Sequence, residues 1–196
     1  MYWYKKIFID KNISKSEQNK ELHEAAFSLL EEKLIKKFHF KKENLKYKYG
    51  LNGKPYLENS PFYFSISHCN NIVACIISKR NVGIDIEDIK EVNKFVVKKS
   101  LTELELSKLV SLNNKEEYFF RIWTLKEALL KVKGFGLSYG MKNIEFYIND
   151  KILSNNKREE NISCNLNRFS FNQEKIKIDD KEYIISVAWE DNYEQY

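Results

Sequence analysis

The sequence predicts an α+β fold made of two similar halves, and the order of its expected elements leads to this prediction. A long helical pattern in the first part of the chain precedes several short apolar runs typical of strands. Later in the chain, further helical patterns precede further strand-like runs. Helices and strands grouped in this way are typical of α+β proteins. We therefore expect an N-terminal half over 1–88 and a C-terminal half over 89–196, which meet near residues 86–91.

The first half opens with an amphipathic helix. Ser14 and Glu17 have the Ser-x-x-Glu spacing of a capping box, in which each side chain bonds the backbone N–H of the other residue. Beyond it, apolar residues recur at helical spacing as far as Phe38: Leu22, Ala26, Leu29, Leu30 and Leu34.

Three strands should follow this helix. Turn residues over 50–55 end the helical pattern, and two apolar runs at 62–66 and 72–77 predict a pair of strands. Residues 82–87 alternate with period two, which predicts a third strand next to the pair and so a three-stranded meander.

The second half begins with helices from about residue 91. Thr102 and Glu105 repeat the capping-box spacing, and a further helix over 116–133 ends at Gly134, as helices commonly end at glycine. Short strands are expected after it, at 144–148, 169–171, 176–178 and 183–189, with a polar loop over 151–161.

Composition excludes several classes of protein. Of the 196 residues, 43% are hydrophobic, which favours a folded chain over a disordered one. No apolar run approaches the roughly 20 residues of a membrane span, and no secretory signal is visible, so we expect a cytoplasmic protein. The net charge of +5 is compatible with an acidic partner or a phosphorylated ligand, and equally with a coding bias towards Lys, Asn and Ile. Three cysteines without C-x-x-C spacing predict reduced, structural thiols: Cys69, Cys75 and Cys164.

Two carboxylates stand on one face of the third expected strand. Asp85 and Glu87 are two residues apart, so both side chains project to the same side. Their charges repel unless a cation lies between them, and Mg²⁺ is commonly held by one or two carboxylates with phosphates and water. The alternative is a solvated strand edge with two exposed acids.

The helix over 116–133 carries a second group of candidates. Trp123, Glu127 and Lys131 are four residues apart and share one face, with Lys126 on the adjoining face. An ordinary exposed Glu–Lys pair is one interpretation. The large indole on the same face instead indicates partial burial, where an acid and a lysine need a ligand or a partner.

Ser67 and His68 end the first strand of the expected pair and could donate hydrogen bonds to an anionic ligand. The alternative is that both are satisfied turn residues.

These segments together resemble a known family. Val82-Gly-Ile-Asp-Ile-Glu87, followed by Trp123-Thr-Leu-Lys-Glu-Ala-Leu-Leu-Lys131, is similar to the two-part signature of the 4′-phosphopantetheinyl transferases. The segments 53–55 and 64–68 resemble family segments that come in the same order upstream, and 134–138 follows the lysine as it does in the Sfp-type branch of that family. Ser65 stands where the family usually carries Asn.

The resemblance implies a monomer of pseudo-dimeric fold, with the active site in the cleft between the two α+β halves. The implied reaction transfers the 4′-phosphopantetheine arm of coenzyme A to a serine of an acyl or peptidyl carrier protein and releases adenosine 3′,5′-bisphosphate. By this likeness Asp85, Glu87 and Glu127 would hold Mg²⁺, and Glu127 would accept the serine proton.

The remaining implied roles concern coenzyme A. Lys131 would stabilise the phosphoryl charge, and Lys54, Ser67 and His68, with Lys131, resemble the coenzyme-binding positions.

Two further hypotheses belong to other classes. A non-catalytic relative would bind a carrier protein or coenzyme A without transfer. A basic nucleic-acid-binding domain is the other, but no RNP-like or zinc-finger pattern accompanies the lysines, so neither a nucleic acid nor a membrane is expected as a partner.

Overall fold

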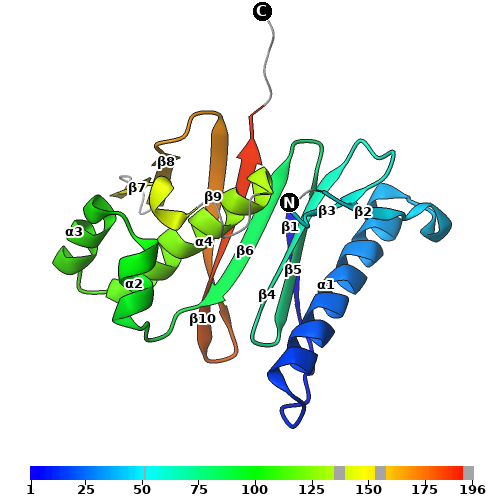
Figure 1. Cartoon of the computed structure of the whole chain (residues 1–196), viewed down its shortest axis with the longest axis horizontal. Helices are drawn as coiled ribbons and strands as arrows, with labels where there is room; N and C mark the ends of the chain where they lie inside the picture. The colour runs from blue at the N-terminus through cyan, green and yellow to red at the C-terminus, as the bar shows by residue number, and fades with distance from the viewer. Residues whose placement is uncertain (51, 135–139, 153–157, 192–196) are drawn as a thin grey trace, which may run out of the picture.

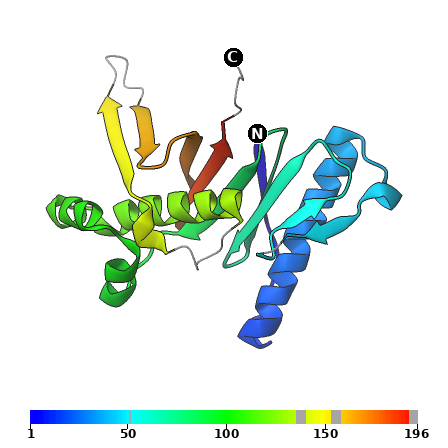
Figure 2. The same cartoon turned by 45° about the horizontal axis from the view of Figure 1, so that its top comes forward.

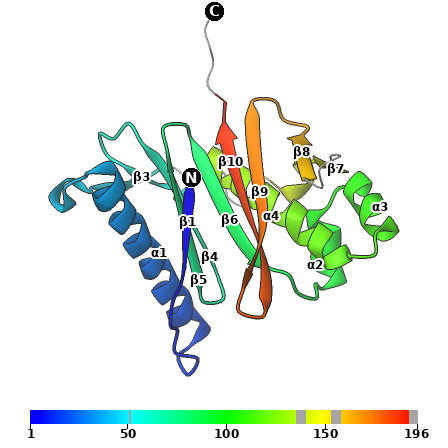
Figure 3. The same ribbon diagram turned by 180° about the vertical axis from the view of Figure 1, so that it is seen from behind.

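The computed structural model describes residues 1–50, 52–134, 140–152 and 158–191, and its α+β architecture confirms the predicted fold class (Figure 1). Two three-stranded sheets lie next to each other. Helix α1 (Lys15–Phe38) packs on the first sheet and α4 (Lys115–Lys133) on the second. Seen from behind, α4 lies beyond the strands of the second sheet (Figure 3).

The first sheet has the antiparallel order β1-β5-β4, with β1 (Tyr2–Lys6), β4 (Tyr63–Cys69) and β5 (Ile72–Ser78). The expected pair of strands is therefore confirmed, with Ile66 opposite Cys75. Strand β1 was not predicted, because a five-residue edge strand with mostly exposed side chains has no apolar alternation.

The predicted meander is wrong. Strand β6 (Val82–Asp88) pairs with β10 (Lys181–Glu190), and Asp85 lies opposite Ser186. The physical reason is that β1 and β4 occupy both edges of β5, so β5 has no free hydrogen-bonding edge for β6. The chain leaves the first sheet at this point, and β6 begins the second.

The second sheet has the order β6-β10-β9. Strand β9 (Phe169–Ile178) is continuous, where two short strands were expected. A separate hairpin, β7 (Phe146–Ile152) with β8 (Arg158–Cys164), projects beside α4 (Figure 2). The loop predicted over 151–161 is therefore partly wrong, since residues 158–161 belong to β8, while 153–157 lie outside the described residues.

The remaining elements are short. They are β2 (Tyr47–Tyr49) and β3 (Pro55–Leu57), which pair with each other, α2 (Lys94–Ser100), α3 (Glu103–Ser111), and the single turns η1 (Lys42–Asn44) and η3 (Met141–Asn143). Both capping boxes are confirmed, at Ser14 and at Thr102. Helix α4 ends at Gly134 in the left-handed conformation, with φ 67°. No helix of the described ranges is both long and apolar enough to cross a membrane.

The core has three parts. One apolar cluster lies under α1 and another under α4, and a third joins both sheets through buried residues of β5, β6 and β10. Strand β4 of the first sheet contacts β6 of the second, which places the chain's two helical layers on either side of this junction. The division of the chain at residue 88 stays a prediction.

Candidate active site

Helix α4 lies unusually close to β6 at Gly83. A Cβ atom at this glycine would stand 2.0 Å from the Ala128 carbonyl oxygen and 2.9 Å from the Val132 nitrogen. Such distances are far inside van der Waals contact, so only glycine permits this approach. The close packing brings the face of α4 that carries Glu127 and Lys131 against the strand that carries Asp85.

Asp85 is the buried centre of this contact, with only 5% of its surface exposed. Its Oδ1 accepts hydrogen bonds from Lys131 Nζ and from Ser67 Oγ, both at 2.8 Å. Its Oδ2 is buried as well and has no hydrogen-bond partner among the described residues. A buried carboxylate oxygen without a partner is destabilising, so it points to a ligand that completes the site.

Glu87 and Glu127 are the other two predicted acids. Burial, and next the negative charge of Asp85, raise the pKa of each carboxyl group to about 7. For Glu127 the charge of Lys131 acts in the opposite direction. The three acids therefore repel one another in the free protein, and each would gain from a shared cation.

The three carboxylates are neighbours, but they do not all converge on one point. Within the described ranges, the trio of possible metal-ligating side chains whose atoms lie within 4.8 Å of one another is Cys69, Glu87 and Asp88. Lys90 Nζ lies 2.5 Å from Asp88 Oδ1 and 3.8 Å from Glu87 Oε2. This lysine neutralises part of the acidic charge at the end of β6, a role that sequence patterns did not reveal.

A cavity of about 210 Å³ opens beside these groups. Residues of β4, of α4 and of the segment before β3 line it, among them Lys54, Ser65, Glu127 and Lys131. Lys54 Nζ donates to Asn81 Oδ1 at 2.8 Å, and burial lowers the pKa of Lys54 to about 8. The predicted residues Lys54, Glu127 and Lys131 thus line one cavity.

Ser67 and His68 are separated by the alternation of β4. Ser67 faces β6 and donates to Asp85, whereas His68 projects from the other face of the strand. Burial, then the positive charges of Lys131 and His23, lower the pKa of His68, which favours its neutral form. Ser67 and His68, which were expected to bind one anionic ligand, therefore lie on opposite faces of β4.

Lys126 is the most deeply buried charged residue of α4 that the structure describes, with 0% exposure. Its Nζ donates to Glu105 Oε2 at 2.5 Å and to the Ser100 carbonyl at 2.8 Å. Glu105 also accepts from the backbone N–H of Thr102 and of Phe146, both at 2.8 Å. This ion pair fixes α4 to the α2–α3 junction and to β7.

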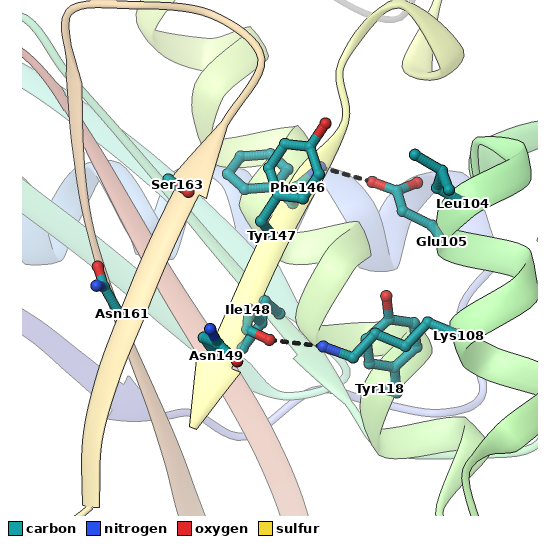
Figure 4. Close-up of a pocket in the computed structure, with 10 residues that line it drawn as sticks. All are labelled: Leu104, Glu105, Lys108, Tyr118, Phe146, Tyr147, Ile148, Asn149, Asn161 and Ser163. Atoms are coloured by element: carbon teal, nitrogen blue, oxygen red, sulfur yellow. Dashed lines mark hydrogen bonds between the residues drawn. The ribbon is translucent and has the colours of Figure 1, made fainter. Parts of the chain in front are cut away.

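A second cavity, of about 370 Å³, lies between α3 and the β7–β8 hairpin (Figure 4). Lys108 Nζ donates to the Ile148 carbonyl across it at 2.6 Å, and the Glu105 bond to Phe146 closes one end. None of the predicted site residues lines this cavity. Its contacts attach the hairpin to α3.

The donor set at the junction suits a hard divalent cation. Mg²⁺ prefers carboxylate oxygens, and this site offers Asp85 Oδ2, which has no partner among the described residues. Glu87 and Glu127 are two further carboxyl groups nearby, and burial raises the pKa of each. The residues present therefore fit a magnesium ion.

Comparisons with known proteins point to one family. The family model of the 4′-phosphopantetheinyl transferase superfamily matches residues 81–188. The 4′-phosphopantetheinyl transferase psf-1 of Bacillus pumilus is 37% identical over 95 residues, which cover 47% of this chain and 41% of that protein. The 4′-phosphopantetheinyl transferase gsp of Aneurinibacillus migulanus is 34% identical over 142 residues, 66% of this chain and 60% of that protein.

The 4′-phosphopantetheinyl transferase Sfp of Bacillus subtilis strain 168 is 30% identical over 108 residues, 54% of this chain and 48% of that protein. The matched segments thus span between 41% and 60% of the length of these three relatives.

Proposed function

Because the chain belongs to the 4′-phosphopantetheinyl transferase superfamily, we propose that it transfers the 4′-phosphopantetheine arm of coenzyme A to a serine hydroxyl of a carrier protein. The serine oxygen forms a bond to the β-phosphorus of coenzyme A, and the bond from that phosphorus to the oxygen that bridges it to the adenosine 3′,5′-bisphosphate breaks. The products are the holo carrier protein and adenosine 3′,5′-bisphosphate.

The observation that carries the proposal is that the carboxylates of Asp85, Glu87 and Glu127 act on one another electrostatically while Lys131 pairs with Asp85. Coenzyme A brings a diphosphate and a 3′-phosphate, so a site for it must offer positive charge. Lys54 and Lys131 line the 210 Å³ cavity together with Glu127. The proposed base Glu127 and the two lysines thus line the same cavity.

Asp85, Glu87 and Glu127 would hold Mg²⁺ in this proposal. When bound, the ion neutralises charge on the diphosphate and makes the phosphorus easier to attack. In the free protein, Lys131 is the cation that faces Asp85, with Nζ 2.8 Å from Oδ1.

Glu127 would accept the proton of the carrier serine. A general base works best when its pKa lies near the working pH. Burial and the Asp85 charge raise the pKa of Glu127 to about 7, which is in that range. Its place on the cavity wall leaves the carboxylate open to a substrate hydroxyl.

Lys131 and Lys54 would bind phosphoryl oxygens of coenzyme A. Lys131 is 30% exposed, so it can exchange its bond to Asp85 for one to a phosphate. Burial lowers the pKa of Lys54 to about 8, and an anionic ligand nearby would raise this pKa again. His68, on the other face of β4, would add a hydrogen-bond donor for another part of coenzyme A.

The proposed partners are an acyl or peptidyl carrier protein and coenzyme A, with the chain acting as a cytoplasmic monomer. No nucleic acid or membrane takes part.

The test is intact-protein mass spectrometry of an apo carrier protein incubated with coenzyme A, Mg²⁺ and this protein. Both an acyl and a peptidyl carrier should be offered. We expect a gain of one phosphopantetheine arm that EDTA prevents, with release of adenosine 3′,5′-bisphosphate in equal amount. Folded protein that modifies neither carrier would contradict the proposal and favour a non-catalytic relative that only binds.

A further inference from the structure

Three side chains of β4 face β6 across the junction of the two sheets. Ser65, Ser67 and Cys69 are two residues apart, so they share one face of the strand. Ser65 Oγ accepts the backbone N–H of Ile84 at 3.2 Å, and Cys69 Sγ accepts that of Asp88 at 3.4 Å. Side chains of the first sheet thus bond to the backbone of β6, the strand of the second sheet that carries the acids.

The Ser67 hydroxyl acts on a carboxylate. Its Oγ lies 2.8 Å from Asp85 Oδ1, and a hydroxyl has one proton to donate. Lys131 donates to the same oxygen at 2.8 Å. Two donors on Oδ1 fix the rotation of the carboxylate, and this leaves Oδ2 as the oxygen without a partner.

The Cys69 thiol stands in the corresponding place beside the second acid. Its Sγ lies 3.3 Å from Glu87 Oε2 and 3.4 Å from Asp88 Oδ1. Cys69 is 7% exposed, and a thiol has one S–H proton to donate. The donors on β4 thus have the same spacing as the acids on β6. Ser67 lies beside Asp85, and Cys69, two residues further along β4, lies beside Glu87.

We propose that Ser67 and Cys69 are positioning residues, whose hydrogen bonds orient the carboxylates of Asp85 and Glu87 for a divalent metal ion. The inference rests on the proposed function, and it gives Ser67 a role different from direct contact with coenzyme A. Ser67 is 6% exposed, and its one proton is already directed to Asp85.

Outer residues that orient ligands influence metal affinity strongly. Loss of such a partner typically weakens binding by about 10–100-fold. A residue that only fills space at the sheet junction would instead lower stability and leave metal affinity unchanged. A residue that contacts coenzyme A would change the KM for coenzyme A and not the affinity for metal.

The experiment measures Mn²⁺ binding to the full chain by electron paramagnetic resonance of the free ion, without coenzyme A. Mn²⁺ accepts the same oxygen ligands as Mg²⁺ and is visible to this method. We expect Ser67→Ala to weaken Mn²⁺ binding by about 10-fold or more, and Cys69→Ala by a smaller factor. Cys69→Ser keeps a donor and should restore most of the affinity.

Ser65→Ala is the matched control. It removes a hydroxyl from the same face of β4, but that hydroxyl bonds the Ile84 backbone and not a carboxylate. Its Mn²⁺ affinity should equal that of the wild type even if its melting temperature falls. Should Ser67→Ala not fold, the comparison of Cys69→Ala with Cys69→Ser carries the same test.

The experiment distinguishes failure of the positioning role from failure of the proposed metal site. If the wild type binds Mn²⁺ and Ser67→Ala and Cys69→Ala bind it equally well, the positioning role is wrong while the proposed metal site stands. A Ser67→Ala protein with unchanged Mn²⁺ affinity and a raised KM for coenzyme A would assign Ser67 to coenzyme binding. If the folded wild type binds no Mn²⁺, both the metal site and this inference are overturned.

Discussion

Lys131 and Asp85 form an ion pair where α4 packs on the second sheet, with Nζ 2.8 Å from Oδ1. The lysine comes from α4 and the aspartate from β6, and the close packing at Gly83 brings them together. Burial first, and then the charge of Asp85, raise the pKa of Glu87 and of Glu127. The Asp85 carboxylate thus interacts with Lys131, with the two other acids and, through Ser67, with β4.

Asp85→Asn should abolish transfer and lower the pKa of Glu127. The amide still accepts from Ser67 and Lys131, so we expect little loss of stability. Without the Asp85 charge, the pKa of Glu127 should move from about 7 towards its ordinary value. Carboxyl NMR titration in EDTA checks the shift, and the transfer assay should show a loss of more than about 100-fold, as removal of a metal ligand exceeds loss of an outer partner. An unchanged Glu127 pKa would mean that Asp85 and Glu127 do not interact.

The metal-free protein should become less stable as pH rises from about 4.5 to about 7. Glu87 and Glu127 have pKa values of about 7 in the folded protein, above their ordinary value of 4.5. The native state therefore binds more protons than the unfolded state across this window, so the free energy of unfolding falls as pH increases. Thermal unfolding in EDTA at a series of pH values measures the trend, and Glu87→Gln with Glu127→Gln should flatten it. Mg²⁺ should raise the melting temperature more at pH 8 than at pH 5.

Gly83→Ala should destabilise the protein by at least about 2 kcal/mol, because the new methyl group would collide with the α4 backbone and force the helix from β6. Gly50→Ala is a suitable control, since its Cβ would meet nothing closer than 3.7 Å and the cost should stay within about 0.5 kcal/mol. Urea denaturation of both variants gives the comparison. Equal stability of Gly83→Ala and the wild type would refute the close approach.

The buried pair of Lys126 and Glu105 should behave as a coupled unit. Lys126→Met leaves the Glu105 carboxylate buried without its cation, which should destabilise the protein by about 3–5 kcal/mol. Adding Glu105→Gln removes that charge while keeping an acceptor for the backbone N–H of Phe146. We expect the double variant to be more stable than Lys126→Met alone in urea denaturation. A double variant that is less stable than Lys126→Met would show that no such coupling exists.

Patterns within a segment were predictable, and contacts between segments were not. Capping boxes at Ser14 and Thr102 are local, and the structure confirms both. The pairing of β6 with β10 depends on residues about 100 positions apart, and no alternation within β6 identifies its partner. The sequence therefore predicted a meander that the structure does not contain.

The same distinction between local patterns and contacts between segments applies to the candidate site. The placement of Glu127 and Lys131 on one cavity follows from helical spacing, which the sequence contains. The contact of Cys69 with Glu87 and the position of Lys90 beside Asp88 depend on how β4 lies along β6 and on the turn after β6. The role of Lys126 also required the structure, because Glu105 is 21 residues away in the chain.

If Glu127 accepts the proton of the carrier serine, transfer requires its carboxylate. The most direct test compares wild type with Glu127→Gln by intact-protein mass spectrometry of the carrier, at equal concentrations of coenzyme A and Mg²⁺ and with folding confirmed by circular dichroism. We expect complete conversion to the holo carrier by the wild type and essentially none by Glu127→Gln over the same time. Conversion by Glu127→Gln at the wild-type rate, or none by the wild type, would contradict it.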